Sequence, residues 1–225
     1  MNMNLLFKNY TLISLGYNCC IKRFFDSIVS KETNFFDYIG TSMWAITELF
    51  ENNFKDIFNK EYYKPIEIMN NQSIKFLSNT KYYIRFLHDL KCNSIDSNPK
   101  LFLQFESKYE RRIKRLDELI KKSDITIFIR LEESFDNRII YKEFEEKTKI
   151  NEYEYVKKFS SIIKSKYSNK KFKIIYLTKT LEESNDIENN ILLLNISNYT
   201  FDWDNSVEVI TKIFNDKYNI VKKYL

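Results

Sequence analysis

Residues 125–131 read Ile-Thr-Ile-Phe-Ile-Arg-Leu, an almost unbroken apolar run. Such a run, rather than an alternation of apolar and polar residues, is typical of a strand that is buried on both faces of a parallel sheet. Two more runs of this kind lie at residues 172–177 and 191–196, and a shorter one spans residues 11–15 and ends at Gly16. We expect all four to belong to one mostly parallel sheet.

Helical patterns separate these strands. Apolar residues recur at helical spacing over residues 105–122 and 207–224, and a helix opens at Asn151 with Glu154 three residues on, as in a capping box. Strands that alternate with helices predict an α/β fold of three layers, Rossmann-like, with helices on both faces of the sheet.

The first half of the chain is less regular. We expect a helix over residues 20–30, an aromatic segment over 35–39 closed by Gly40, and a helix from Thr41 or Ser42 to about residue 53. Residues 54–65 have no regular pattern. Residues 74–77 and 82–87 suit a hairpin, with His88 at the end of its second strand. We therefore predict one domain, 1–225, in which about 41–104 form an insertion that carries His88.

Composition excludes several classes of protein. The chain has 225 residues, a net charge of +5 and three cysteines. No apolar run reaches membrane-spanning length, no secretory signal is visible at residues 1–10, and three cysteines make no disulfide framework. We expect a cytoplasmic protein. The basic residues around 108–122 are interleaved with acidic ones, so a helix face in solvent is favoured over nucleic-acid binding.

Known cofactor motifs are missing as well. Two glycines, Gly16 and Gly40, cannot supply a P-loop or a dinucleotide-binding loop, and one histidine with three scattered cysteines gives no zinc motif. We expect no cofactor and no metal. In an open α/β sheet, ligands bind beyond the carboxyl ends of the strands. Those ends are followed by residues 16–19, 130–133, 178–179 and 197–198, and His88 and Asp89 also follow a strand.

Cys19 is the candidate nucleophile among these residues. It follows a turn that contains Gly16 and precedes a helix, and a helix N-terminus together with Lys22 and Arg23 would lower its pKa. A thiolate there would suit covalent catalysis. The alternative is that Cys19 is a small buried apolar residue, which is our expectation for Cys20.

His88 is the one imidazole that the chain offers as a base, although a lone histidine at a strand end is commonly structural. A Cys–His pair needs a third group that orients the ring, and Asp37 and Asp89 are the candidates. Asn18 could donate a hydrogen bond to an oxyanion.

Arg111, Arg112 and Arg130 are notable in a lysine-rich chain, because arginine binds carboxylates and phosphates through two parallel hydrogen bonds. They could hold an anionic part of a substrate. For Arg130, an internal ion pair with Glu132 or Glu133 is the alternative.

Four motifs together resemble a known family. Residues 14–19 (Ser-Leu-Gly-Tyr-Asn-Cys), 34–39 (Asn-Phe-Phe-Asp-Tyr-Ile), 86–90 (Phe-Leu-His-Asp-Leu) and 109–115 (Tyr-Glu-Arg-Arg-Ile-Lys-Arg) are similar, in this order, to motifs of a bacterial and giant-virus domain family of unknown function. Its members are described as papain-like cysteine peptidases. The resemblance covers roughly residues 11–200; Asn34 and Tyr38 stand where the family usually has Pro and Trp.

The resemblance implies Cys19 as nucleophile and His88 as base, and it also singles out Asp37, Arg112 and Arg130. Papain-like folds pack a helix with the Cys against an antiparallel sheet with the His, so a papain-like α+β fold is the alternative architecture. Members of the family often neighbour glycosyltransferases, which suits an acyl-transfer or glycan-modifying role.

We therefore predict a thiol-dependent hydrolase or acyltransferase, possibly a peptidase, that acts on a small-molecule, glycan or peptide substrate. One alternative is a non-covalent domain for an anionic sugar or nucleotide, held by Arg111, Arg112 and Arg130. Another is a host-interaction module that uses an aromatic surface around Tyr62 and Tyr63.

Overall fold

The structure is a computed structural model, and it gives the backbone alone for residues 66–70 and 72–76. It describes residues 3–16, 19–28, 32–70, 72–86, 88–92, 94–132, 151–201 and 204–225.

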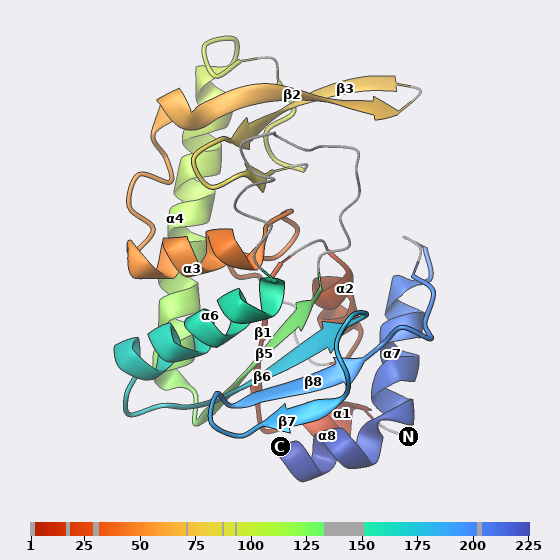
Figure 1. Cartoon of the computed structure of the whole chain (residues 1–225). Helices are drawn as coiled ribbons and strands as arrows, with labels where there is room; N and C mark the ends of the chain where they lie inside the picture. Colours follow the sequence, from red (N-terminus) through yellow and green to blue (C-terminus); the bar gives the residue numbers. More distant parts are fainter. Residues whose placement is uncertain are drawn as a thin grey trace.

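Five strands form the main sheet, in the order β1-β5-β6-β8-β7 (Figure 1). They are β1 (Thr11–Ser14), β5 (Ile125–Leu131), β6 (Lys171–Thr178), β7 (Ser184–Asp186) and β8 (Ile191–Asn195). β1, β5, β6 and β8 are parallel, and β7 adds an antiparallel edge. The predicted α/β class and the mostly parallel sheet are confirmed. Sequence reasoning missed β7 because Ser-Asn-Asp carries no apolar signal.

Helices cover both faces of this sheet, as Figure 1 shows. One face packs against α3 (Met43–Glu51), α4 (Pro99–Lys122) and α6 (Glu152–Lys166). The other packs against α1 (Met3–Phe7), α2 (Cys20–Ile28), α7 (Ser206–Asp216) and α8 (Tyr218–Tyr224). In β5, Phe128 enters the first core, whereas Ile127 and Ile129 enter the second. Burial on both sides explains why the strand is apolar at nearly every position.

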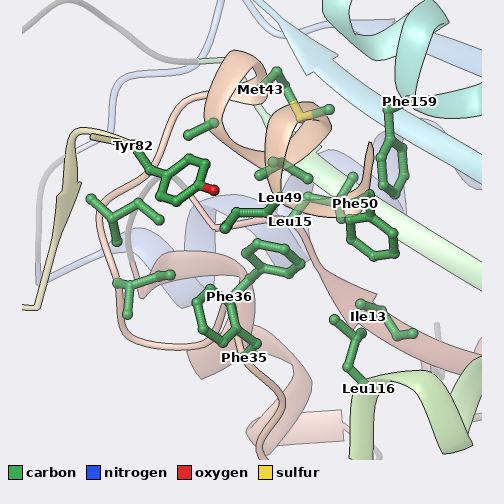
Figure 2. Packing of buried hydrophobic residues seen from close by; sticks show 14 of the residues in the cluster. Ile13, Leu15, Phe35, Phe36, Met43, Leu49, Phe50, Tyr82, Leu116 and Phe159 are labelled. Atoms are coloured by element: carbon green, nitrogen blue, oxygen red, sulfur yellow. The ribbon is translucent and has the colours of Figure 1, made fainter. Parts of the chain in front are cut away.

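The core on the α3 side is rich in aromatic residues (Figure 2). Phe36 stacks on Phe50 of α3, with ring centroids 6.0 Å apart, and Phe50 meets Phe159 of α6 edge to face at 5.2 Å. Phe35 packs edge-on against Tyr109 of α4 at 5.5 Å. Phe36 and Phe35 thus attach the predicted aromatic segment 35–39 to α3 and α4, and Phe50 extends this packing to α6. These contacts hold Asp37 and Tyr38, which belong to the same segment, in place.

A second, antiparallel sheet has the order β2-β3-β4. Its strands are β2 (Tyr63–Asn70), β3 (Gln72–Asn79) and β4 (Ile84–Arg85), and a short 3-10 turn, η1 (Lys60–Tyr62), precedes them. The predicted hairpin is wrong in detail, because β3 pairs along its length with β2 and meets β4 at only two positions. His88 lies in a turn after β4 rather than at the end of a strand.

Two other expectations need correction. The closing helix is broken at Lys217 into α7 and α8. Tyr63 is only 5% exposed and packs on Phe86, Phe102 and Phe105, so it cannot form part of an aromatic docking surface with Tyr62. The division of the chain into one domain with an insertion at 41–104 stays a prediction. No described helix combines the length and apolar character that crossing a bilayer requires.

Candidate functional site

Cys19 lies between the end of β1 and the start of α2. Its carbonyl oxygen accepts a hydrogen bond of 2.9 Å from the Arg23 amide, so Cys19 caps the helix. The side chain is 4% exposed. Burial raises the pKa of the thiol to about 11, the neighbouring Cys20 adds to the rise, and the charge of Arg23 opposes it. The expectation of a lowered pKa is therefore wrong, because the loss of hydration outweighs the positive charge.

The turn before Cys19 depends on Gly16. Its φ of +70° lies in the left-handed region, and a Cβ there would be 2.5 Å from Cγ2 of Thr41. The Gly16 amide donates a hydrogen bond to Oγ of Ser14. Only glycine fits this position without strain. Gly16 therefore packs closely against Thr41, in the segment that leads into α3.

Asp37 lies in the turn after residue 34 and is completely buried. Its carboxylate accepts hydrogen bonds from the backbone amide of Asn34 at 2.7 Å and from the Asn34 side chain at 3.3 Å. Burial raises its pKa to about 7, against the lowering effects of the Asn34 amide, Lys22 and Arg112. The Asp37 carboxylate is thus bonded to Asn34 at the start of its own turn.

Tyr38 is the link between the two halves of the site. Its ring meets the His88 ring nearly at right angles, at 84°, with centroids 6.1 Å apart. Its hydroxyl donates a 2.8 Å hydrogen bond to Asp26 of α2. Burial, the Asp26 hydrogen bond and nearby negative charges raise the pKa of Tyr38 to about 12, and the charge of Cys19 is among those that contribute. Tyr38 therefore contacts the His88 ring directly and is joined through Asp26 to α2, the helix that Cys19 caps.

The other candidate orienting group, Asp89, is also engaged. Its carboxylate lies 2.5 Å from Nζ of Lys108 and accepts a 2.8 Å hydrogen bond from the Tyr109 hydroxyl, both on α4. His88 itself is exposed. Over the described ranges, no hydrogen bond joins His88 to Cys19 or to a carboxylate.

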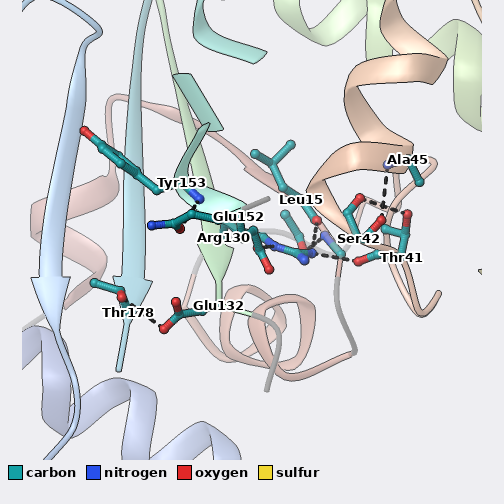
Figure 3. Close-up of polar contacts among 12 residues, drawn as sticks. Leu15, Thr41, Ser42, Ala45, Arg130, Glu132, Glu152, Tyr153 and Thr178 are labelled. Atoms are coloured by element: carbon teal, nitrogen blue, oxygen red, sulfur yellow. Dashed lines mark hydrogen bonds and ion pairs between the residues drawn. The ribbon is translucent and has the colours of Figure 1, made fainter. Parts of the chain in front are cut away.

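The three arginines have different surroundings. Arg111 is exposed on α4, whereas Arg112 is 8% exposed, donates to the carbonyl oxygen of Asp37 at 3.4 Å and lies over the Tyr109 ring. Arg130 is fully buried, and Figure 3 shows its guanidinium between three segments. It donates to the carbonyl oxygens of Leu15 and Thr41, each at 2.9 Å, and pairs with Glu152 of α6 at 2.7 Å.

At the carboxyl ends of β5 and β6, Glu132 accepts hydrogen bonds from the Thr178 hydroxyl at 3.0 Å, the Lys179 amide at 2.6 Å and the Thr180 hydroxyl (Figure 3). Glu132 thus joins the ends of β5 and β6, which are two of the predicted strand ends. Asn18 and Glu133 lie outside the described residues. Among the residues that the structure describes, no group of three or more His, Cys, Asp or Glu side chains is placed to hold a metal ion.

Sequence reasoning missed Asp26, and it considered Tyr38 only as part of a motif and Lys22 only as a positive charge near Cys19. Lys22 is 1% exposed, and its Nζ lies 2.6 Å from the carboxylate of Asp26 and also donates to the carbonyl oxygen of Glu32. The i, i+4 spacing of Lys22 and Asp26 on a predicted helix was an available signal. No sequence pattern indicates that Asp26 also accepts from Tyr38.

One comparison with known proteins identifies a family. A family model described as "Putative papain-like cysteine peptidase (DUF1796)" matches residues 10–182, which include Cys19, Asp37, His88 and Arg130. No curated protein and no solved structure matches the chain. Because the family model spans well over half of the chain, the protein belongs to the DUF1796 family of papain-like cysteine peptidase-like domains.

Proposed function

We propose that the protein is a thiol-dependent hydrolase or acyltransferase with Cys19 as nucleophile and His88 as base. The observation that carries the proposal is that Tyr38 joins the elements that carry both residues. Its ring contacts His88 in the turn after β4, and its hydroxyl donates to Asp26 of α2, the helix that Cys19 caps. The family name supports thiol chemistry of this kind. A peptide or acylated small molecule or glycan would be the substrate.

The raised pKa of Cys19 defines how the reaction would start. With a pKa of about 11, the group is a neutral thiol at pH 7 rather than half of a thiolate–imidazolium pair. The thiol proton must then leave as the sulfur attacks, which is general-base catalysis. A closure that brings the exposed His88 ring towards Sγ of Cys19, with its contact to Tyr38 kept, would be needed, since catalytic hydrogen bonds often form only in the substrate complex.

The steps balance as follows. Sγ of Cys19 forms a bond to the substrate carbonyl carbon, its proton passes to a ring nitrogen of His88, and the carbonyl electron pair moves to oxygen. Backbone N–H groups at the start of α2 lie at the positive end of the helix dipole and would stabilise this oxyanion. The leaving group then departs with the proton from His88. Water, or another acceptor, attacks the thioester and restores the thiol.

The test is acylation of Cys19 by a p-nitrophenyl ester, followed by nitrophenolate release and by peptide mass spectrometry. We expect the acyl group on Cys19, no acylation there in Cys19→Ser, and a rate lower by about 10²-fold or more in His88→Ala. Cys92→Ser is the matched control, because Cys92 is a partly exposed cysteine whose pKa burial also raises. Acylation of Cys92 in place of Cys19, or a rate that does not depend on His88, would contradict the proposal.

The binding-domain alternative gains no support from the arginines. Arg112 and Arg130 are buried and donate to backbone carbonyl oxygens, which leaves Arg111 as the exposed member of the three. Their surroundings are those of groups that hold the chain together.

A further inference from the structure

We propose that Tyr38 is the residue that positions His88, in the role that a carboxylate or amide has in most Cys–His sites. This inference rests on the proposed function. Tyr38 is a positioning residue here, because it acts through His88 and has no part in the bonds that form or break.

Both carboxylates that could orient the ring are already used. Asp37 points back to the amide and side chain of Asn34, and Asp89 points to Lys108 and Tyr109 on α4. Throughout the described part of the chain, the contact that fixes the His88 ring is the edge-to-face one with Tyr38. Edge-to-face packing is directional, so it restricts the orientation of an imidazole ring as well as its place.

Tyr38 is itself held by polar contacts that lead to α2. Its hydroxyl donates to Asp26 at 2.8 Å, and Asp26 is paired at 2.6 Å with Lys22, which is buried in α2. Both partners lie within the first two turns after Cys19. α2, which begins directly after Cys19, therefore also holds the Tyr38 ring that contacts His88. This couples the positions of Cys19 and His88.

The backbone at Tyr38 gives an independent argument. Its φ of 65° is left-handed, which is strained for an aromatic residue and easy for Gly or Asn. Two arginines of α4 hold the loop in this shape, since Arg112 donates to the carbonyl oxygen of Asp37 and Arg115 to that of Thr33 at 2.7 Å. An aromatic ring at a position that would suit Asn or Gly better points to a use for the ring.

α4 also holds the turn that carries His88, through a contact with Asp89. Tyr109 donates to Asp89, the neighbour of His88, and its ring carries the Arg112 guanidinium 4.8 Å above its centroid. Tyr109 and Arg112 are one turn apart on α4, and they hold the two segments whose side chains meet as Tyr38 and His88. The contact between these two rings is thus supported from both sides.

The experiment uses the fact that His88 is the single histidine of the chain, so its imidazole proton signals in NMR need no assignment. We compare wild type with Tyr38→Phe, Tyr38→Asn and Tyr83→Asn, and record the His88 ring signals and the His88-dependent rate of Cys19 acylation. Tyr38→Asn removes the ring and suits the backbone. Tyr83→Asn is the matched control, because Tyr83 has a φ of 52° and packs on Trp44.

We expect Tyr38→Asn to shift the His88 signals towards those of a free imidazole and to lower the acylation rate by about 10²-fold, as misplaced catalytic groups do. Tyr38→Phe keeps the ring but loses the hydrogen bond to Asp26, so we expect a smaller shift of the His88 signals and a smaller loss of rate than in Tyr38→Asn. Tyr83→Asn should change neither. If Tyr38→Asn behaves like Tyr83→Asn, the inference is overturned. If the acylation rates of Cys19→Ser and His88→Ala equal that of wild type, the proposed function itself is overturned.

Discussion

Asp37 is the residue through which the chain's stability depends on pH. Its pKa is raised by burial from 3.8 to about 7 in the folded chain. Between these values the folded state keeps a proton that the unfolded state has lost. The contribution of Asp37 to stability therefore falls as the pH rises from about 4 to 7, because the charged carboxylate is the disfavoured form inside the protein.

We expect Asp37→Asn to flatten this dependence, since the amide does not titrate. The measurement is the urea midpoint of unfolding at several pH values between 4 and 7. Asp124→Asn, at an exposed aspartate, is the control and should leave the slope as it is in wild type. Equal slopes in wild type and Asp37→Asn would show that the Asp37 carboxyl does not bind a proton in this range.

Gly16 offers a second prediction at this scale. Gly16→Ala should lower the free energy of unfolding by about 1–2 kcal/mol from the left-handed φ alone, plus the cost of the Cβ that would lie 2.5 Å from Cγ2 of Thr41. Thr41→Ser removes that methyl group. In the Thr41→Ser background we expect a smaller loss, with a coupling energy of about 1 kcal/mol in the double-mutant cycle. Additive losses would place the whole effect in the backbone.

Among the elements, β1, α3 and α6 meet at the guanidinium of Arg130. Sequence patterns predicted the strands and most of the helices here, because apolar periodicity reflects burial directly. They could not predict the partners of Arg130, because two of these are the carbonyl oxygens of Leu15 and Thr41, and every residue has such a group. They also could not predict the pKa of Cys19, because the sequence shows nearby charges but not the loss of hydration that outweighs them.

We expect Arg130→Met to lower the free energy of unfolding by about 3–5 kcal/mol, because it leaves the Glu152 carboxylate beside an apolar side chain. Glu152→Gln should recover part of this loss in the double variant. The measurement is a double-mutant cycle in urea. Lys157→Met, which removes an exposed i, i+3 pair with Glu154 on the same helix, is the control and should cost well under 1 kcal/mol.

Across the whole molecule, the main sheet separates two cores, and the turn that carries His88 packs on the α4 side through Phe86, Phe105 and Tyr109. The α7 side was predicted well, because its helices and strands are regular. The segment from 54 to 90 was predicted poorly, since β2 and β3 form a long antiparallel pair in a region whose aromatic residues follow neither a helical nor a strand period. This segment carries His88, so the sequence located the candidate base without the contact that its ring makes with Tyr38.

This separation predicts which core variants disturb the site. Phe214 stacks on Phe24 of α2 and meets Phe7 edge-on in the α7 core, so Phe214→Ala should cost about 3–5 kcal/mol. The path from this core to His88 runs through α2, Asp26 and Tyr38, so we expect only a small shift of the His88 NMR signals. Phe86→Leu, two residues from His88 and packed on Phe105 and Tyr109, should shift those signals more at a smaller cost in stability. Signals that move as far in Phe214→Ala as in Phe86→Leu would contradict the separation.

The arginines that hold the site bind carbonyl oxygens of the main chain, at Leu15, Thr33, Asp37 and Thr41. A main-chain oxygen stays in place when the side chain on the same residue changes. Substitutions at Thr33, for example, cost no anchor, whereas loss of Arg115 removes one. Mutational tolerance should therefore be unequal across the site: high where a loop offers its backbone, and low on the helix and strand that supply the guanidinium groups.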